Sequence, residues 1–170
     1  MQASRPPNGL RFLENLAYLV PGYHGYRQCE LRREEDSRMR ARVCRSIDGL
    51  MGGMGGLRSQ WNGQAPASLL EALEEGQRQL ARSAEMVRYA PGQLTRFFEA
   101  ERVSELTLER VLEADLLIFQ DLEEAQTQVG LGVRLSAAPR TIRRFLRELD
   151  EILHRLDEHL LMRERILAGG

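Results

Sequence analysis

Apolar side chains recur every three or four residues in four long segments of the chain, which is the spacing of amphipathic helices. In the last segment the stripe consists of Ile142, Phe145, Leu149, Ile152, Leu153, Leu156 and Leu160. Earlier stripes consist of Met39, Val43, Ile47, Leu50, Met54 and Leu57; of Leu69, Leu73, Leu80, Ala84 and Val87; and of Leu108, Val111, Ile118, Leu122, Ala125 and Val129. No segment keeps the alternation of a strand. The pattern predicts an all-α fold, an elongated four-helix bundle with antiparallel, coiled-coil-like packing.

Proline and capping residues set the expected boundaries of these helices. We expect one domain over 1–170, with long helices over 26–60, 66–90, 104–129 and 139–167. A short helix over 9–19 and a turn rich in tyrosine and glycine precede them, within residues 1–25. Pro66 and Pro139 open their helices, and Ser104 caps another.

Glycines mark the expected weak points of the bundle. The segment Gly52–Gly56 holds four glycines, and each costs a helix roughly 1 kcal/mol relative to alanine. We therefore expect a kinked helix end or a loop there. Gly130 and Gly132 should end the third long helix, over 104–129, whereas Gly76 lies on an apolar stripe and should allow close helix approach.

Charged residues occupy positions that should face the core. At helical spacing, Arg32 and Asp36 lie within about 30° of the centre of their stripe, and Asp115 lies between Val111 and Ile118 on another. An unpaired buried carboxylate is costly, so we expect Asp36 and Asp115 to bind Arg32. Arg33 and tyrosine hydroxyls should lie nearby. The candidate polar cluster is Tyr23, Tyr26, Arg32, Arg33, Asp36 and Asp115.

Two interpretations of this cluster follow. The favoured one is that it fixes the register of the helices and seats the turn before them, which is the best-attested use of buried ionic groups. The alternative is a ligand or anion pocket, in which an Asp115 of shifted pKa acts as an acid or base. No nucleophile is placed beside Asp115 by the pattern.

Arginine supplies all 24 basic side chains, so each cation is a planar fork suited to carboxylate or phosphate. The formal net charge of -1 argues against a dedicated nucleic-acid-binding protein. A second candidate surface lies near the start of the last helix and consists of Arg140, Arg143, Arg144 and Arg147. Cations there oppose the helix dipole, so an acidic partner, an anion or a membrane phosphate would relieve the conflict. The alternative is a solvated face paired with Glu148 and Glu151.

The residues do not assemble a recognisable catalytic or metal site. Glu151 and His154 match the Glu-x-x-His element of di-iron bundles, but that site needs a second copy. The three histidines are His24, His154 and His159, and with the cysteines they offer no zinc spacing. We therefore expect no catalysis, no metal and no cofactor.

The motif Pro-Gly-Tyr-x-Gly-Tyr followed by Glu-x-Arg-Arg-Glu-x-Asp, over Pro21 to Asp36, resembles the opening of a family of uncharacterised prokaryotic helical proteins. Arg88-Tyr-Ala90, Arg96-Phe-Phe-Glu99 and Ala114-Asp115 stand where that family continues with similar elements. The chain departs from the pattern at Arg96, Glu99, Ala114 and the glycine run. The resemblance covers most of the chain and implies no known activity; it also implies a setting beside stomatin-like membrane scaffolds.

The segment Leu10–Val20 is too short and too charged for a membrane span or a signal sequence. Cys29 and Cys44 lie 15 residues apart on one expected helix and cannot pair within it. Free thiols indicate a cytoplasmic protein, which could also be membrane-peripheral. We expect a non-catalytic, self-associating scaffold or adaptor that binds proteins. The alternatives are a membrane-surface stress or scaffold component that contacts anionic lipid or a stomatin-like partner, and a metal- or small-ligand-binding bundle.

Overall fold

The computed structural model describes residues 16–20, 22, 25–89, 96–100, 103–135 and 138–169. Its elements are η1 (Cys29–Leu31), α2 (Arg32–Trp61), α3 (Ala67–Tyr89), α4 (Arg96–Glu99), α5 (Glu105–Gly132) and α6 (Pro139–Ala168). The described ranges contain helices and turns but no strand. The predicted all-α fold with four long packed helices is confirmed.

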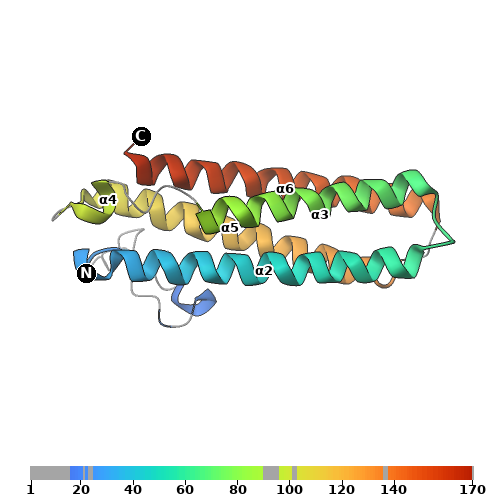
Figure 1. Ribbon diagram of the computed structural model, residues 1–170, viewed down its shortest axis with the longest axis horizontal. Helices are drawn as coiled ribbons and strands as arrows, with labels where there is room; N and C mark the ends of the chain where they lie inside the picture. The colour runs from blue at the N-terminus through green and yellow to red at the C-terminus, as the bar shows by residue number, and fades with distance from the viewer. Residues whose placement is uncertain are drawn as a thin grey trace, which may run out of the picture.

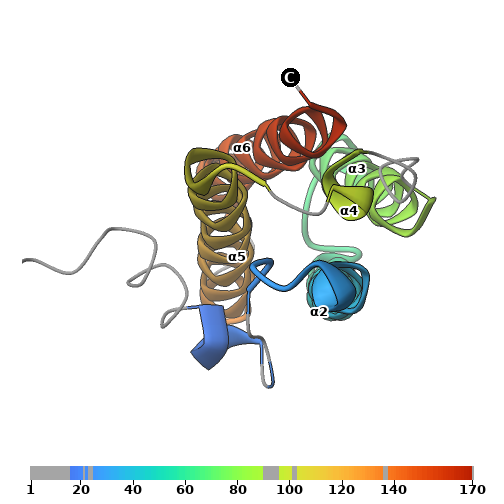
Figure 2. The same ribbon diagram turned by 90° about the vertical axis from the view of Figure 1, so that its left-hand side faces the viewer.

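The four long helices form two antiparallel hairpins, α2 with α3 and α5 with α6 (Figure 1). Seen along the bundle, the neighbours follow one another in the order α2, α3, α6, α5 (Figure 2). Adjacent helices from different hairpins, α2 with α5 and α3 with α6, therefore run parallel. The short helix α4, between α3 and α5 in the chain, lies at one end of the bundle (Figure 2). We call this the network end, after the buried polar network described below. The opposite end contains the α2–α3 and α5–α6 turns, and we call it the turn end.

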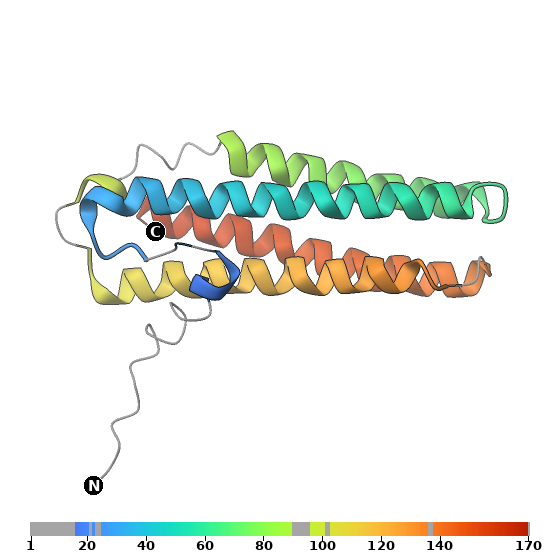
Figure 3. The same ribbon diagram turned by 90° about the horizontal axis from the view of Figure 1, so that it is seen from below.

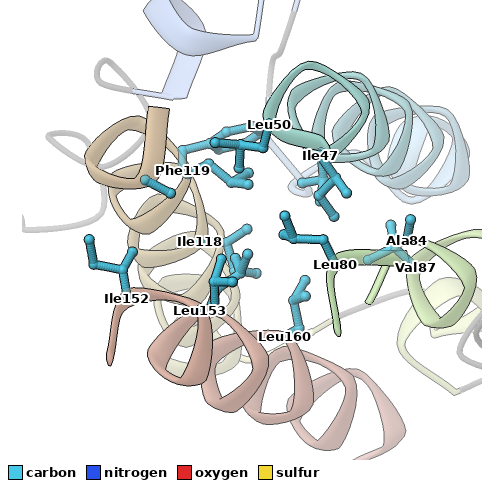
Figure 4. Packing of buried hydrophobic residues seen from close by; sticks show 14 of the residues in the cluster. Ile47, Leu50, Leu80, Ala84, Val87, Ile118, Phe119, Ile152, Leu153 and Leu160 are labelled. Carbon is cyan, nitrogen blue, oxygen red and sulfur yellow. The ribbon is translucent and has the colours of Figure 1, made fainter. Parts of the chain in front are cut away.

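The predicted apolar stripes meet in a shared core (Figure 4). Every stripe residue is buried except Leu108, which is partly buried. A second stripe on α5, which the sequence analysis did not identify, consists of Leu112, Leu116 and Phe119. The chain before α2 runs beside this part of α5 (Figures 2 and 3). Leu16 and Val20 of that segment are buried, so it belongs to the core.

The helix predicted to start at Tyr26 begins later. Gly25 has a φ of +79°, and Gln28 is extended, so the first helical turn is η1 and α2 starts at Arg32. This irregular backbone turns the Tyr26 side chain into the interior, where it is 1% exposed. Residues 16–19 are helical, and the rest of the short helix predicted over 9–19 lies outside the described residues.

The predicted interruption at Gly52–Gly56 is wrong, because α2 passes through it to Trp61. Met54, Leu57 and Trp61 are fully buried, so tertiary packing outweighs the low helix propensity of the glycines. Gly53 also serves the packing, since a Cβ there would lie 2.7 Å from Val129.

The other glycines act through close packing too. Helix α5 continues past Gly130 to Gly132, where an added Cβ would lie 2.8 Å from Leu57 and 2.9 Å from Phe145. The predicted end at residue 129 is therefore wrong by one turn. The expected close approach at Gly76 is present, with Met54 3.0 Å from an added Cβ.

The helix starts follow their predicted signals. The Ser104 hydroxyl accepts a hydrogen bond from the Thr107 amide at 3.1 Å, and α6 begins at Pro139. Within the described ranges, no helix is both long and apolar enough to cross a membrane.

Candidate functional site

Arg163 of α6 lies at the centre of a buried polar network at the network end. Its guanidinium donates to Asp115 of α5 at 2.5 Å, to Asp36 of α2 at 2.7 Å and to the Tyr26 hydroxyl at 2.8 Å. The Tyr26 hydroxyl donates in turn to the other Asp115 oxygen at 2.8 Å. One arginine thus links α2, α5, α6 and the segment before α2 through charge-assisted hydrogen bonds.

Arg40 extends the network towards α3. Its Nε donates to Asp36 at 2.7 Å, Nη1 to the Val87 carbonyl at 2.9 Å and Nη2 to Glu164 at 2.8 Å. The Val87 carbonyl lies in the last turn of α3, where backbone acceptors lack intrahelical partners. Arg40 therefore supplies a cation to Asp36 and a donor to the end of α3.

Arg32 does not bind the carboxylates as the sequence predicted. It donates to the carbonyl of Tyr26 at 2.8 Å, of Phe97 at 3.1 Å and of Ala100 at 2.5 Å. Its guanidinium also lies 5.7 Å from the centre of the Phe97 ring. Because those carbonyls belong to the turn before α2 and to the α4 region, Arg32 fastens both to the start of α2.

Arg33 lies outside the buried network. It is exposed, 3.6 Å from Glu99, with its guanidinium 5.7 Å from the Phe98 ring centre. A depression lined by Arg33, Asp36, Ser37 and Phe98 lies beside the network. Tyr23 lies outside the described residues.

The network is buried and electrically balanced at its centre. Asp115 and Arg163 are at most 1% exposed, Asp36 is 2% and Arg40 is 5% exposed. These two cations and two carboxylates sum to zero formal charge. Burial raises the pKa of Asp115, although Arg163 and Tyr26 partly oppose the effect. Desolvation lowers the pKa of Arg163, but the combined attraction of Asp115, Tyr26 and Asp36 outweighs it, so the pKa lies well above its usual value.

Sequence reasoning missed Arg163 and Arg40, although both carry a readable signal. Arg163 lies three residues after Leu160 and four before Leu167, so it continues the apolar stripe of α6. Arg40 follows Asp36 by four residues, the spacing of a helical ion pair.

The four arginines predicted as a binding face lie at the turn end, and all four are exposed. Arg144 donates to Glu148 at 2.7 Å, and Arg147 lies 4.0 Å from Glu151. Arg140 and Arg143 have no carboxylate partner in the described part of the chain. The face is therefore only partly neutralised, with its two uncompensated cations in the first turns of α6.

An apolar groove lies beside these arginines, between the end of α5 and the start of α6. Leu131, Leu135 and Phe145 contribute its apolar lining, and Arg144 and Glu148 are among the polar residues at its edge.

Two exposed aliphatic side chains lie at the same turn, Leu131 at 51% and Val133 at 57% exposure. From Ala125 to Arg147 the sequence contains five arginines and no acidic residue. The groove, the two exposed aliphatic side chains and the arginines of this stretch together form a surface that we call the basic end. Its arginines are Arg134, Arg140, Arg143, Arg144 and Arg147.

The remaining candidate ligands are dispersed. Glu151 and His154 of the Glu-x-x-His element are exposed on α6. His159 instead contacts the buried Asp121, with 2.6 Å between Nδ1 and the carboxylate. Cys29 and Cys44 are free thiols. The described residues contain no group of three or more histidine, cysteine or acidic side chains placed to hold a metal ion.

Comparison with protein-family models, curated proteins and solved structures gave no match to this chain. The resemblance to the prokaryotic helical family therefore rests on the motifs alone, and the functional argument rests on the geometry of the two ends of the bundle.

Proposed function

We propose that the protein is a non-catalytic helical scaffold or adaptor that binds acidic protein surfaces through its basic end. The observation that carries the proposal is the stretch Ala125–Arg147, which has five arginines, no acidic residue and an apolar groove beside two exposed aliphatic side chains. Binding sites on proteins combine such an apolar centre with a charged rim. A partner with carboxylates around an apolar anchor would complement it.

The network end supports this division of roles. Asp36 and Asp115 both accept hydrogen bonds from Arg163 inside the bundle, and Arg32 donates to backbone carbonyls. These contacts hold four chain segments in one arrangement, as expected of a structural lock. A rigid bundle can then present the basic end without reorganising on binding.

An acidic protein suits the basic end better than the alternative of an anionic membrane. Glu148 stands in the groove, and the hydrogen bond from Arg144 holds its pKa below the ordinary value. A charged carboxylate there repels any anion placed over it, and the Gln128 amide donates to it at 3.1 Å. A protein partner can place a neutral or donor group at that point and its carboxylates elsewhere, whereas a surface of lipid phosphates cannot. Such fixed polar groups favour a partner that can match them individually.

Affinity capture with matched charge variants tests the proposal. Arg143→Glu reverses an unpaired exposed arginine of the basic end, and Arg45→Glu does the same on α2 with an equal change in net charge. The purified chain, immobilised on beads, should retain an acidic partner from its native host; Arg143→Glu should lose it and Arg45→Glu should keep it. Equal retention by all three chains would contradict the proposal.

A vesicle assay separates the membrane alternative. We expect no co-sedimentation with phosphatidylserine–phosphatidylcholine vesicles at physiological salt. Binding that Arg143→Glu removes and Arg45→Glu leaves intact would instead assign the basic end to anionic lipid and overturn the choice of a protein partner.

A further inference from the structure

An apolar patch lies on the outer face of α3 and α6, in the half of the bundle nearer the network end. Leu161 of α6 is 45% exposed, and Tyr89 of α3 is 80% exposed. Met86 and Leu161 line a groove where the two helices meet, and the helices are neighbours in the bundle (Figure 2). We call Met86, Tyr89 and Leu161 the α3–α6 patch.

Two charges of opposite sign flank this patch along α6. Glu158 precedes Leu161 by three residues, and Arg165 follows it by four. Both are exposed, and neither has an ion-pair partner in the described part of the chain. Seven residues place them within about 20° of one line along the helix and about 10 Å apart. One strip of α6 thus reads acidic, apolar, basic.

The other carboxylates of this face are already compensated within the chain. Asp157, in the groove, accepts hydrogen bonds from Gln79 and Ser83. Glu164 accepts a hydrogen bond from Arg40 of the polar network. Glu158 and Arg165 are therefore the charges of this strip that a partner can still neutralise.

We propose that a second copy of this chain binds the α3–α6 patch, in an antiparallel twofold dimer whose axis passes between residues 161 and 162 of α6. Such an axis exchanges positions 158 and 165. Glu158 of each copy therefore faces Arg165 of the other, and the two Leu161 side chains pack beside each other at the centre. The strip is complementary to itself, which is the requirement of a closed twofold interface.

The same axis also matches the two α3 helices. Because Ser83 bonds Asp157 and the helices run parallel, Met86 and Tyr89 lie at about the levels of residues 160 and 163 of α6. The axis exchanges these two levels, so Met86 of each copy lies against Tyr89 of the other. A thioether beside an aromatic ring is a favourable contact. The interface then has an apolar centre and a charged rim.

The size of the overlap sets the expected strength of the dimer. This axis lets the α6 helices overlap over residues 155–168, a length of about 20 Å. Two adjacent helices present a face about 20 Å wide, so the dimer buries roughly 800 Å² in total. That is below the range of stable specific interfaces, about 1,200–2,000 Å². The dimer is therefore reversible, and it weakens as salt screens the rim pairs.

The arrangement leaves both basic ends free, at opposite tips of the dimer. Arg143 lies 18 to 19 residues from the axis along α6, so the two basic ends are about 55 Å apart. The dimer would then carry two docking surfaces for acidic partners. This consequence rests on the proposed function, whereas the dimer itself does not.

Sedimentation velocity over a concentration series, at low and high salt, tests the dimer. The wild-type chain should show a reversible monomer–dimer equilibrium that shifts to monomer at high salt. Glu158→Arg and Arg165→Glu should each raise the dissociation constant at least about tenfold, because each places like charges opposite one another twice in the dimer. Arg45→Glu, on the exposed surface of α2, should leave it unchanged.

A second pair of variants tests the apolar centre. Leu161→Ser should raise the dissociation constant at least about tenfold, because it removes the contact at the axis. Leu106→Ser, at a 66% exposed leucine of α5, is the matched control and should dimerise as wild type does. Circular dichroism confirms that each variant is folded.

Charge exchange provides the sharpest comparison. An equimolar mixture of Glu158→Arg and Arg165→Glu should form heterodimers, because opposite charges face each other again at both ends of the interface. The double variant Glu158→Arg/Arg165→Glu should likewise dimerise with itself. If the double variant does not fold, the mixture decides.

Three results would overturn the inference: a wild-type chain that is monomeric throughout, charge variants that dimerise as well as wild type, or folded variants that the mixture does not restore. Species larger than dimers would overturn the closed twofold arrangement.

Arg143→Glu separates the dimer from the adaptor function, because Arg143 lies outside the overlap. We expect this variant to dimerise as wild type does and to lose the acidic partner. A monomeric wild-type chain whose partner is still lost on Arg143→Glu would refute the dimer alone. A dimer whose partner capture does not depend on Arg143 would refute the adaptor function alone.

Discussion

Replacing Arg163 with methionine tests whether the polar network determines the stability of the bundle. The side chain is 1% exposed and bonds Asp115, Asp36 and Tyr26. Methionine fills a similar volume with flexible apolar atoms, so the change removes the cation with little loss of packing. The carboxylates it bonded stay buried.

The expected cost follows from the geometry of the pair. Removing one partner of a buried ion pair typically destabilises a protein by about 3–5 kcal/mol, because the other charge stays desolvated. Asp36 keeps its 2.7 Å contact with Arg40, so most of the cost falls on Asp115. We expect a loss of about 3 kcal/mol at pH 7, a large share of the 5–15 kcal/mol that stabilises most domains.

The pH dependence distinguishes an electrostatic cost from a packing defect. Burial raises the folded-state pKa of Asp115 above its ordinary value of 3.8, and loss of Arg163 removes an opposing attraction and raises it further. A carboxyl with a raised folded pKa contributes stability below its unfolded pKa and loses that contribution as pH rises through the folded pKa. Lowering the pH from 7 towards 4 should therefore narrow the gap between Arg163→Met and wild type.

Equilibrium urea unfolding measures this gap. Circular dichroism follows all the helices, and fluorescence of Trp61, the single tryptophan, follows the turn end. Coincident transitions justify a two-state free energy. Arg144→Met is the matched control on the same helix, because its ion pair with Glu148 is exposed, and it should change stability by less than about 0.5 kcal/mol. A loss below about 1 kcal/mol for Arg163→Met, or a gap that does not depend on pH, would refute the reasoning.

Substitutions of two tyrosines and two glycines probe the network end and the glycine-rich helix α2. Tyr26→Phe removes a buried hydroxyl bonded to charged groups and should lower the free energy of unfolding by about 1.5–3 kcal/mol. Tyr89→Phe, at an 80% exposed side chain, should leave it unchanged. Melting curves of Tyr26→Phe and wild type that coincide would exclude the hydroxyl from the network. Gly52→Ala, which meets nothing within 4 Å, should raise the thermal midpoint through about 0.5–1 kcal/mol of helix propensity. Gly53→Ala should lower it, because the new Cβ would lie 2.7 Å from Val129; a gain for both would contradict the assigned packing.

The sequence located most of the bundle because helical periodicity is a local property. The stripe of α6 depends only on residues three and four apart, and each member of that stripe is buried. Ser104 and Pro139 marked helix starts for equally local reasons, through a capping hydroxyl and a missing amide hydrogen. Propensity failed at Gly52–Gly56, because Met54 within the segment and Leu57 directly after it are held by the core and keep the backbone helical.

The same local reasoning placed Asp36, Asp115 and Arg32 on inward faces, which follows from their positions on the helical wheel. It did not assign their partners, because a partner on another helix depends on the axial register and on which helices are neighbours. The structure decided both: packing α5 against α6 and the segment before α2 against α5 puts Arg163 between the two aspartates and leaves Arg32 to the carbonyls around α4. The sequence by itself thus determines which residues face inward. Which charges pair is determined by the three-dimensional arrangement of four separate chain segments.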